Sequence, residues 1–360
     1  MSTLQADPQA SGDEGAPSDP REPCDMSVAP ATVMSHKPDS HKPDSHKPDS
    51  HSRDEPTPGL PGDGTLLSAT GVRLGELAVR RLLPKRQRRT VGAWCFVDHY
   101  GPTSVDGGPG MQVPPHPHIG LQTVTWLFDG EVLHRDSLGN EQLIRPGQLN
   151  LMTAGRGIAH AEQSPNGADP TLHGLQLWVA LPDRMRQSAP DFAHHAQLPR
   201  ERIGGFDVTV FLGSHATLSS PAATVSELLG AELVTVRTTQ NQELPLDPAF
   251  EHGVLVVAGS ALVQRTPLAP GALLALDPGL PALSISATAG TRLILLGGRP
   301  FDEPLLMWWN FVARTADEIV TATRQWATGD VFGAVAGYRG APLAAPELDA
   351  ARLVARPPNR

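Results

Sequence analysis

The sequence predicts an all-β protein made of two tandem jelly-roll barrels, with a short helix and tail at the carboxyl end. The first observation is a series of short apolar runs separated by turn residues, among them Asp129-Gly130 and Pro146-Gly147. The second is the alternation of side-chain types in residues 121–128, which has the period of two that a strand requires. Strands are predicted likewise at 131–135, 142–144 and 148–152. Many short strands with glycine-rich turns are typical of antiparallel barrels.

The third observation is an internal repeat. Residues 146–155 resemble residues 270–279, with the same spacing between a Pro-Gly turn and a closing glycine, and residues 130–133 resemble residues 259–262. The chain is therefore interpreted as two copies of one β unit. We expect an amino-terminal barrel at 67–190, a carboxy-terminal barrel at 200–315, and a helix and tail at 316–360. Within the last part, Thr315 to Thr328 lacks glycine and proline and is predicted to be helical.

Residues 1–66 are rich in proline, aspartate, serine and glycine. Such a segment buries too little apolar surface to offset its ordering entropy, so it is predicted to be disordered. A five-residue repeat, His-Lys-Pro-Asp-Ser, begins at His36, His41 and His46. We interpret it as a low-complexity linker, because each proline keeps the backbone extended and the histidines lack a fixed geometry. Loose metal capture is the alternative.

Composition excludes several classes of partner. The net charge of −9 argues against direct nucleic-acid binding, which requires a clustered basic face. The one basic cluster, residues 85–89, is interpreted as a solvated loop, with a partner or phosphate contact as the alternative. Two cysteines, no secretion signal and no apolar run long enough for a bilayer favour the cytoplasm. We expect a monomer without a membrane contact.

Two short motifs carry the chemistry. His116 and His118 lie two residues apart, so in a strand they point to the same face, and the same spacing recurs at His160 and Glu162. If the two strands face one cavity, three imidazoles and one carboxylate converge on a metal ion. This ligand set favours Fe²⁺, with manganese, nickel, copper, cobalt and zinc as alternatives. A solvated strand face is the structural alternative, and two such pairs within one β unit argue against it.

The second copy of the repeat lacks these ligands. Alignment on the Pro-Gly turns and on Gly130 and Gly259 places other residues opposite the four candidates, namely Ser284, Ser286, Pro245 and Asp247. One metal ion per chain is therefore expected.

Other residues of the first barrel are candidates for supporting roles. His134 is a candidate for a hydrogen bond that orients a ligand. Trp126, Phe128 and Met152 are candidates for apolar walls of a substrate pocket, with plain core packing as the alternative for each.

From about Leu74 to Thr315 the sequence resembles the pirins, a family of two-domain cupins. The resemblance is dense over Pro115–Trp126 and continues through 130–137, 152–162 and 297–304. It implies a metal, usually iron, held by the residues that match His116, His118, His160 and Glu162, and a carboxy-terminal barrel without metal. Two activities are associated with pirins: cleavage of flavonols such as quercetin by O₂, and metal-dependent binding of proteins that regulate transcription or metabolism.

One position departs from the family pattern. Many pirins carry glutamate four residues after the second motif histidine, where this chain has Gln122. The resemblance implies that pirins take their carboxylate from the position of Glu162 instead, so the ligand set is expected to be intact, with Gln122 as a candidate supporting residue.

The resemblance leads to a hypothesis for the reaction. The 3-hydroxyl and carbonyl of a flavonol would approach the metal, which acidifies the hydroxyl. Glu162 would accept that proton as catalytic base, and ring cleavage would release carbon monoxide and a depside. The alternative is a non-catalytic, iron-dependent regulator whose redox state changes the charge presented to a transcription factor or metabolic enzyme.

Overall fold

The computed structural model describes residues 64–74, 77–105, 108, 110–165, 167, 170–357 and 359. These residues all belong to one compact unit, Glu55–Arg360. The five-residue repeat, and with it residues 1–63 of the segment predicted to be disordered, lies outside the described residues. Thr65 and Leu66, the last described part of that predicted segment, lie in strand β1 (Thr65–Ser68).

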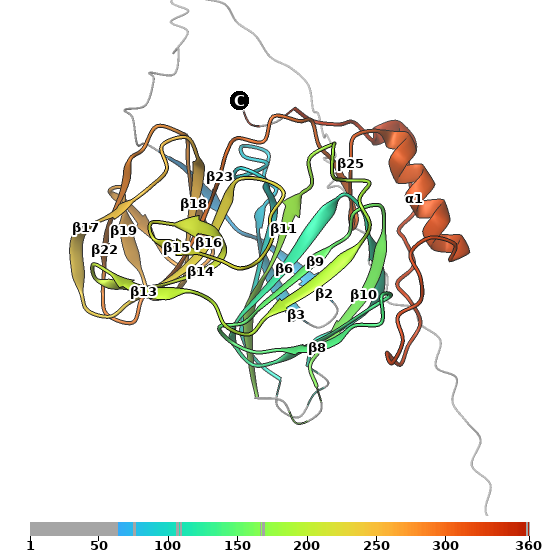
Figure 1. Ribbon diagram of the computed structural model, residues 1–360, viewed down its shortest axis with the longest axis horizontal. Helices are drawn as coiled ribbons and strands as arrows, with labels where there is room; N and C mark the ends of the chain where they lie inside the picture. The colour runs from blue at the N-terminus through green and yellow to red at the C-terminus, as the bar shows by residue number, and fades with distance from the viewer. Residues whose placement is uncertain are drawn as a thin grey trace, which may run out of the picture. The chain divides into compact units, whose positions relative to one another are not determined.

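The first barrel consists of a seven-stranded and a four-stranded antiparallel sheet (Figure 1). The larger sheet contains, in spatial order, β12 (Asp191–His195), β9 (Leu149–Thr153), β6 (Leu121–Asp129), β11 (Thr171–Ala180), β4 (Trp94–Ser104), β3 (Leu77–Leu83) and β2 (Thr70–Leu74). The smaller sheet contains β5 (Gln112–His118), β10 (Ile158–Gln163), β7 (Val132–Asp136) and β8 (Glu141–Ile144). The four strands predicted from the alternation, β6 to β9, are confirmed to within one residue at each end.

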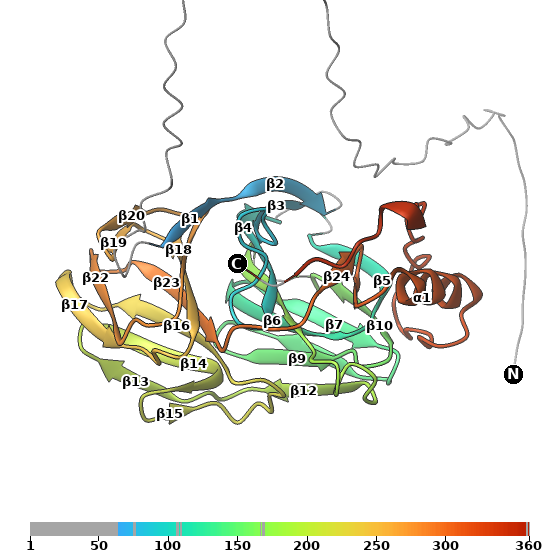
Figure 2. The ribbon, with the colours of Figure 1, turned by 90° about the horizontal axis from the view of Figure 1, so that it is seen from above.

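The second barrel repeats this plan with an eight-stranded and a four-stranded sheet (Figure 2). The path of the larger sheet is β1, β21 (Ala272–Leu276), β18 (Glu251–Ala258), β23 (Arg292–Gly298), β16 (Leu228–Thr235), β14 (Phe206–His215) and β13 (Arg200–Ile203), with β15 (Leu218–Ser219) paired to β14. The smaller sheet contains β17 (Thr239–Pro245), β22 (Ala282–Ala287), β19 (Ala261–Val263) and β20 (Thr266–Leu268). The predicted all-β architecture of two tandem jelly rolls is confirmed.

Strand pairing crosses between the barrels at the start of the chain. β1 pairs with β21 of the second barrel, whereas β2, after one intervening residue, pairs with β3 of the first. The blue ribbon in Figure 2 follows this crossing from one barrel to the other. The first strands of the chain therefore connect both barrels.

Aromatic side chains fill the contact between the barrels. Trp126 of β6 stacks on Phe211 of β14 with ring centroids 4.8 Å apart, and its indole N–H donates to Glu232 at 3.1 Å. The indole N–H of Trp94 lies 3.1 Å from the carbonyls of both Leu229 and Gly297. Each buried tryptophan nitrogen thus has an acceptor in the partner barrel, as buried indoles require.

Arg88, from the basic cluster, is buried between the barrels. Its guanidinium forms ion pairs with Glu251 at 2.9 Å and with Asp277 at 2.5 Å, and its side chain is only 6 % exposed. The solvated-loop interpretation is therefore wrong for this residue. Glu251 is buried as well, whereas Asp277 is exposed, so the pair with Glu251 is the one that is strongly desolvated.

A hairpin and a helix follow the second barrel and pack on the first. β24 (Leu306–Trp308) and β25 (Phe311–Ala313) form the hairpin, and the Val312 N–H donates to the carbonyl of Ile119. The helix α1 (Ala316–Thr328) begins at Thr315, whose hydroxyl accepts from Glu318 N–H, and ends at Gly329 in the left-handed conformation. The predicted helix is confirmed. No helix in the described ranges has the length and apolar character needed to cross a bilayer.

We predict that Arg88→Met lowers the free energy of unfolding by about 3 kcal/mol, because it leaves buried Glu251 without its cation. Urea unfolding would measure the loss. Asp277→Asn is the matched control, and since its carboxylate is exposed we expect a loss below about 1 kcal/mol. Equal losses of unfolding free energy in the two variants would contradict the conclusion that the buried pair with Glu251 matters more than the exposed pair with Asp277.

Candidate metal centre

The pairing of β5 with β10 builds the centre. β5 is an edge strand of its sheet, the position at which a strand tolerates prolines without losing ladder hydrogen bonds. In this pairing His116 lies directly opposite His160. A register shift between His160 and Glu162 marks a bulge, a common feature beside functional sites.

The three predicted histidines meet inside the first barrel. The ring centroid of His116 lies 5.0 Å from that of His118 and 4.4 Å from that of His160. The distance between the rings of His118 and His160 is 5.0 Å. Each of the three residues is at most 6 % exposed, and each offers one nitrogen within 4.8 Å of the others. The structure thus brings the histidines of both motifs together, and their role as metal ligands stays a prediction.

Hydrogen bonds fix the Nδ1 atom of each ring. Nδ1 of His116 lies 2.9 Å from the Pro114 carbonyl, and Nδ1 of His118 lies 2.9 Å from the Asn310 carbonyl. Nδ1 of His160 lies 3.4 Å from Nδ1 of His134. Carbonyls only accept, so the first two rings carry their proton on Nδ1. Their Nε2 lone pairs are then left free, as metal-ligating histidines require.

The donor set fits a metal ion. Nε2 of His118 lies 3.1 Å from Nε2 of His160. Two nitrogens bound at about 2.1 Å and at roughly a right angle are separated by about 3 Å. The tautomers inferred above for His116 and His118 leave the Nε2 lone pair of each ring free, and the short distance between His118 and His160 suits a cation between them.

Glu162 occupies the neighbouring position on β10. Its Oε1 accepts from the Thr125 hydroxyl at 3.0 Å, and it is 6 % exposed. Glu162 groups with His160 and His134, whereas His116 and His118 group with His160 alone. His160 is thus common to the two sets of candidate donors, and coordination by Glu162 stays a prediction.

His134 lies behind His160. Its Nε2 is 3.2 Å from Asp136 Oδ2, and its ring stacks on Phe192 with centroids 4.5 Å apart. The chain from His160 through His134 to Asp136 has the arrangement in which a carboxylate and a second group orient a ligating imidazole.

Burial sets the charge of these groups. Desolvation lowers the pKa of His116 to about 4 and moves the pKa values of His118 and His160 well below the ordinary value. The three rings are therefore neutral near pH 7 and available as ligands. Desolvation raises the pKa of Glu162, against the opposing influence of His134 and the Thr125 hydroxyl.

Three predicted supporting residues do not face this cavity. Trp126 and Phe128 share the opposite face of β6, where Trp126 contacts Phe211 of the second barrel and Arg292 lies over the Phe128 ring. Gln122 is on that same face, and its amide donates to Thr153. The pocket-wall prediction is wrong for both aromatics because side chains alternate along a strand, and residues 123, 125 and 127 are the ones that point inward. Met152, paired with Thr123, faces the barrel interior.

The second barrel has an apolar cluster in the same place. In the first barrel His134 pairs with Glu162 and His116 pairs with His160. The corresponding pairs of the second barrel are Val263–Ile285 and Leu244–Leu283. These aliphatic residues belong to one buried core.

The sequence alignment of the two copies was therefore offset. Its counterparts for the candidate ligands were Ser284, Ser286, Pro245 and Asp247, whereas by pairing and by face the counterparts are Leu283, Ile285, Leu244 and Leu246. An offset of one residue turns every side chain of a strand to the other face. Among the described residues, the groups that could hold a metal all lie in the first barrel.

Asn310 and Thr125 were not predicted from sequence. Asn310 contributes a backbone carbonyl from the hairpin and lies 192 positions from His118. No local pattern identifies such a contact. Asp136, in contrast, lies two residues from His134 on the same strand face, and that spacing was a usable signal.

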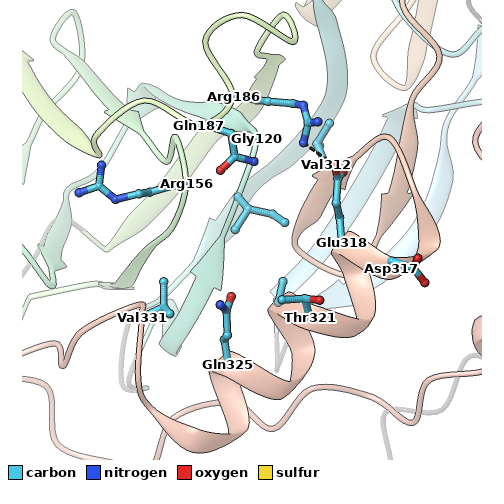
Figure 3. Close-up of a pocket in the computed structure, with 12 residues that line it drawn as sticks. Gly120, Arg156, Arg186, Gln187, Val312, Asp317, Glu318, Thr321, Gln325 and Val331 are labelled. Atoms are coloured by element: carbon cyan, nitrogen blue, oxygen red, sulfur yellow. Dashed lines mark ion pairs between the residues drawn. The ribbon is translucent and has the colours of Figure 1, made fainter.

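A separate pocket of about 410 Å³ lies between α1 and the loops of the first barrel. Figure 3 shows Gln325 and Thr321 of the helix facing Arg156 and Gln187, with Arg186 paired to Glu318. Ile119 and Gly120 line this pocket directly after His118. Gly120 has a φ of +69°, and a Cβ there would lie 2.0 Å from the Val312 carbonyl, so the turn after His118 requires glycine.

Fold and cluster together define a two-domain cupin with a candidate metal centre in its first barrel. Residues 76–179 match the family model described as Pirin, and residues 233–333 match the Pirin C-terminal cupin domain. The chain belongs to the pirin family.

Individual relatives agree with this assignment. A Pseudomonas aeruginosa protein named "Putative quercetin 2,3-dioxygenase" is 47 % identical over 276 residues, which cover 76 % of this chain and 87 % of that protein. The crystal structure of quercetin 2,3-dioxygenase from Acinetobacter baumannii is similar with a TM-score of 0.78 and 43 % identity, covering 81 % of this chain and 97 % of that one. The nickel(II) complex of a bacterial pirin from Escherichia coli shares the fold, with a TM-score of 0.54, 19 % identity, and coverage of 66 % and 99 %.

We predict that the metal-free protein loses stability as the pH falls from about 6.5 to about 4. His116 has a folded pKa below its unfolded value of 6.5, so the unfolded chain takes up the proton first and acid favours unfolding. His116 alone would contribute on the order of 3 kcal/mol. Glu162 acts in the opposite sense: its pKa is raised in the folded chain, so its contribution to stability is present at low pH and is lost as the pH rises above 4.5. The three histidines together outweigh this single group, so the net effect of acid is a loss of stability.

Urea midpoints measured in EDTA near pH 7 and near pH 5 would check this dependence. A midpoint that is unchanged or higher at the lower pH would contradict it. The variant His116→Leu should show a flatter profile than the natural chain.

Proposed function

We propose that this protein is a metal-dependent dioxygenase that cleaves flavonol-like compounds with O₂. The metal would be held by His116, His118, His160 and Glu162. The observation that carries the proposal is the convergence of three neutral imidazoles with their Nε2 atoms turned to one point. The names of the P. aeruginosa and A. baumannii relatives support quercetin as the substrate type.

Iron is the metal that we propose, because a histidine-rich set with one carboxylate and open positions suits non-haem iron. Manganese, nickel, copper, cobalt and zinc are the alternatives. When bound, the metal would supply a Lewis acid that lowers the pKa of the flavonol 3-hydroxyl.

Glu162 is the proposed base. Burial raises the pKa of its carboxyl, which makes the carboxylate a better proton acceptor than an exposed glutamate. The Thr125 hydroxyl, 3.0 Å from Oε1, holds the carboxylate toward the cavity. We propose that Glu162 takes the proton of the substrate 3-hydroxyl.

The overall reaction balances without a further reductant. Both atoms of O₂ enter the depside product, and carbon 3 of the flavonol leaves as carbon monoxide with its own oxygen. The protein's part is to hold the substrate, keep the base in place and exclude bulk water, which the burial of the cluster supports.

Metal analysis and oxygen uptake test the proposal. We expect about one metal ion per chain, as the single convergent cluster implies. After anaerobic loading with ferrous iron, the protein should consume O₂ with quercetin, and His160→Ala should reduce the rate at least a hundredfold. No uptake above the His160→Ala control, across several flavonols and metals, would refute the dioxygenase.

His134 supplies a second test. We propose that it orients His160, so His134→Phe should lower metal affinity by about 10- to 100-fold while leaving the ring stack on Phe192 in place. Metal affinity would be measured by competition with a chelator. His134→Gln, which keeps hydrogen bonding, should recover part of the affinity. Affinity unchanged in both variants would remove His134 from the site.

An iron-dependent regulator is the alternative function. It would use the same four residues, bind metal without turnover, and present a charge that changes with redox state to a protein partner. Bound metal without oxygen uptake in the test above would favour it. We place either activity in the cytoplasm, in a monomer, on the basis of the composition.

A further inference from the structure

The wall of the first barrel that faces the candidate ligands carries a continuous line of polar side chains. Register pairs it across five neighbouring strands, β3, β4, β11, β6 and β9. We call it the polar row, and its members are Arg81, Asp98, Gln176, Thr125 and Asn150. Side chains at directly paired positions point to the same face, so the five share one surface.

The polar row borders the metal centre. Thr125, its member on β6, donates to Glu162 at 3.0 Å. Two residues away from the row on β4 and β11, Phe96 stacks on Trp178 with centroids 4.0 Å apart. Trp178 in turn lies 5.2 Å from the ring of His118. The guanidinium of Arg81 lies 4.5 Å from the centre of the Phe96 ring, so the polar row and these aromatic rings are in contact beside the candidate ligands.

Several polar atoms of the row have hydrogen-bonding capacity that the described residues do not use. Thr125 Oγ1 lies within reach of both Glu162 Oε1 and Gln176 Oε1, at 3.0 and 3.2 Å, yet its one proton can serve only one of them. No described residue accepts from the amide nitrogen of Gln176. The buried Nδ2 of Asn150 also has no partner among the described residues, although its Oδ1 accepts from His194 at 2.7 Å.

Exposure changes along the row. Asp98, Thr125 and Asn150 are 6 %, 3 % and 3 % exposed, whereas Gln176 between the first two is half-buried. Solvent therefore reaches part of the Gln176 side chain. At the outer end, Arg81 holds Asp98 through two hydrogen bonds of 2.8 and 2.7 Å and keeps 34 % of its side chain exposed. Three strand spacings, roughly 14 Å, separate Thr125 from Arg81.

We infer that the polar row binds the ring hydroxyls of a flat, polyhydroxylated aromatic substrate, with Gln176 as the specificity-determining residue. This inference rests on the proposed function. The reacting central ring of the substrate lies at Glu162 and Thr125, and one outer ring, the far ring, extends over Gln176 in the direction of Arg81. Gln176 donates its free amide hydrogens to substrate oxygen, and Arg81, which uses two of its five donors on Asp98, has others for the far ring.

The test compares two ligands that share the flavonol core. Quercetin carries ring hydroxyls, and 3-hydroxyflavone carries none. Binding of each to the full chain loaded with nickel(II) would be measured anaerobically by fluorescence titration, so that the readout does not depend on turnover. Gln176→Met removes the amide at nearly constant size, and Gln176→Glu keeps the acceptor for Thr125 but loses the amide donors. Gln187→Met, an exposed glutamine of the pocket beside α1, is the matched control.

We expect both Gln176 variants to weaken quercetin binding about 5- to 10-fold, the effect of about one hydrogen bond, with less than about a twofold change for 3-hydroxyflavone. Gln187→Met should change neither. An equal loss for both ligands, no loss for quercetin, or no binding of either flavonol by the natural chain would overturn the inference. A selective loss in a protein that consumes no oxygen would retain the binding surface and refute the dioxygenase instead.

Discussion

The register between β5 and β10 is the constraint on which the candidate centre depends. It sets His116 opposite His160 and turns both motifs into the barrel. A slip of either strand by one residue would direct the two predicted ligands of that strand outward. Contacts from the carboxy-terminal hairpin and tail hold β5 in this register. The hairpin carbonyl of Asn310 accepts from His118, and the N–H of Leu343 in the tail donates to Pro115 of β5. The carboxy-terminal segment thus stabilises the strand that carries two of the three imidazoles.

The two barrels show what the same framework does with different side chains. Where the first has imidazoles and a carboxylate, the second has leucine, isoleucine and valine in one buried core. Burying polar groups costs stability unless they are paired, and the first barrel carries that cost at its centre. The second barrel offsets it through apolar packing and through contacts such as Trp126 with Phe211 and Arg88 with Glu251. The second barrel, whose core is apolar, therefore stabilises the first barrel through these contacts.

The electrostatic environment of the candidate centre and its geometry both favour metal binding. Burial keeps His116, His118 and His160 neutral, and neutral imidazoles are the form that binds metals. The same burial raises the pKa of Glu162, which suits a proton acceptor. One physical cause, the exclusion of water by the barrel walls, thus prepares both kinds of group. Thr125 connects this centre to the polar row on the facing wall, so the same strands would set the positions of the proposed ligands and of the proposed substrate.

Local sequence was sufficient for the features that depend on neighbouring residues. The alternation predicted β6 to β9, and the absence of glycine and proline predicted α1. The spacing of the two motifs predicted that His116 shares a strand face with His118, and His160 with Glu162. These features follow from the period of the backbone and from side chains a few positions apart. The family was recognisable for the same reason, since its motifs are contiguous stretches.

Tertiary structure decided which face of each strand is the inside and which distant groups meet. Alternation alone cannot say whether odd or even positions point inward, and this is why Trp126 and Phe128 were assigned to the wrong side of β6 and why the second copy was aligned one residue out. The contact of Asn310 with His118, the burial of Arg88 between the barrels and the polar row across five strands join residues that are far apart in sequence. Such contacts depend on strand order and register, which only the folded chain defines.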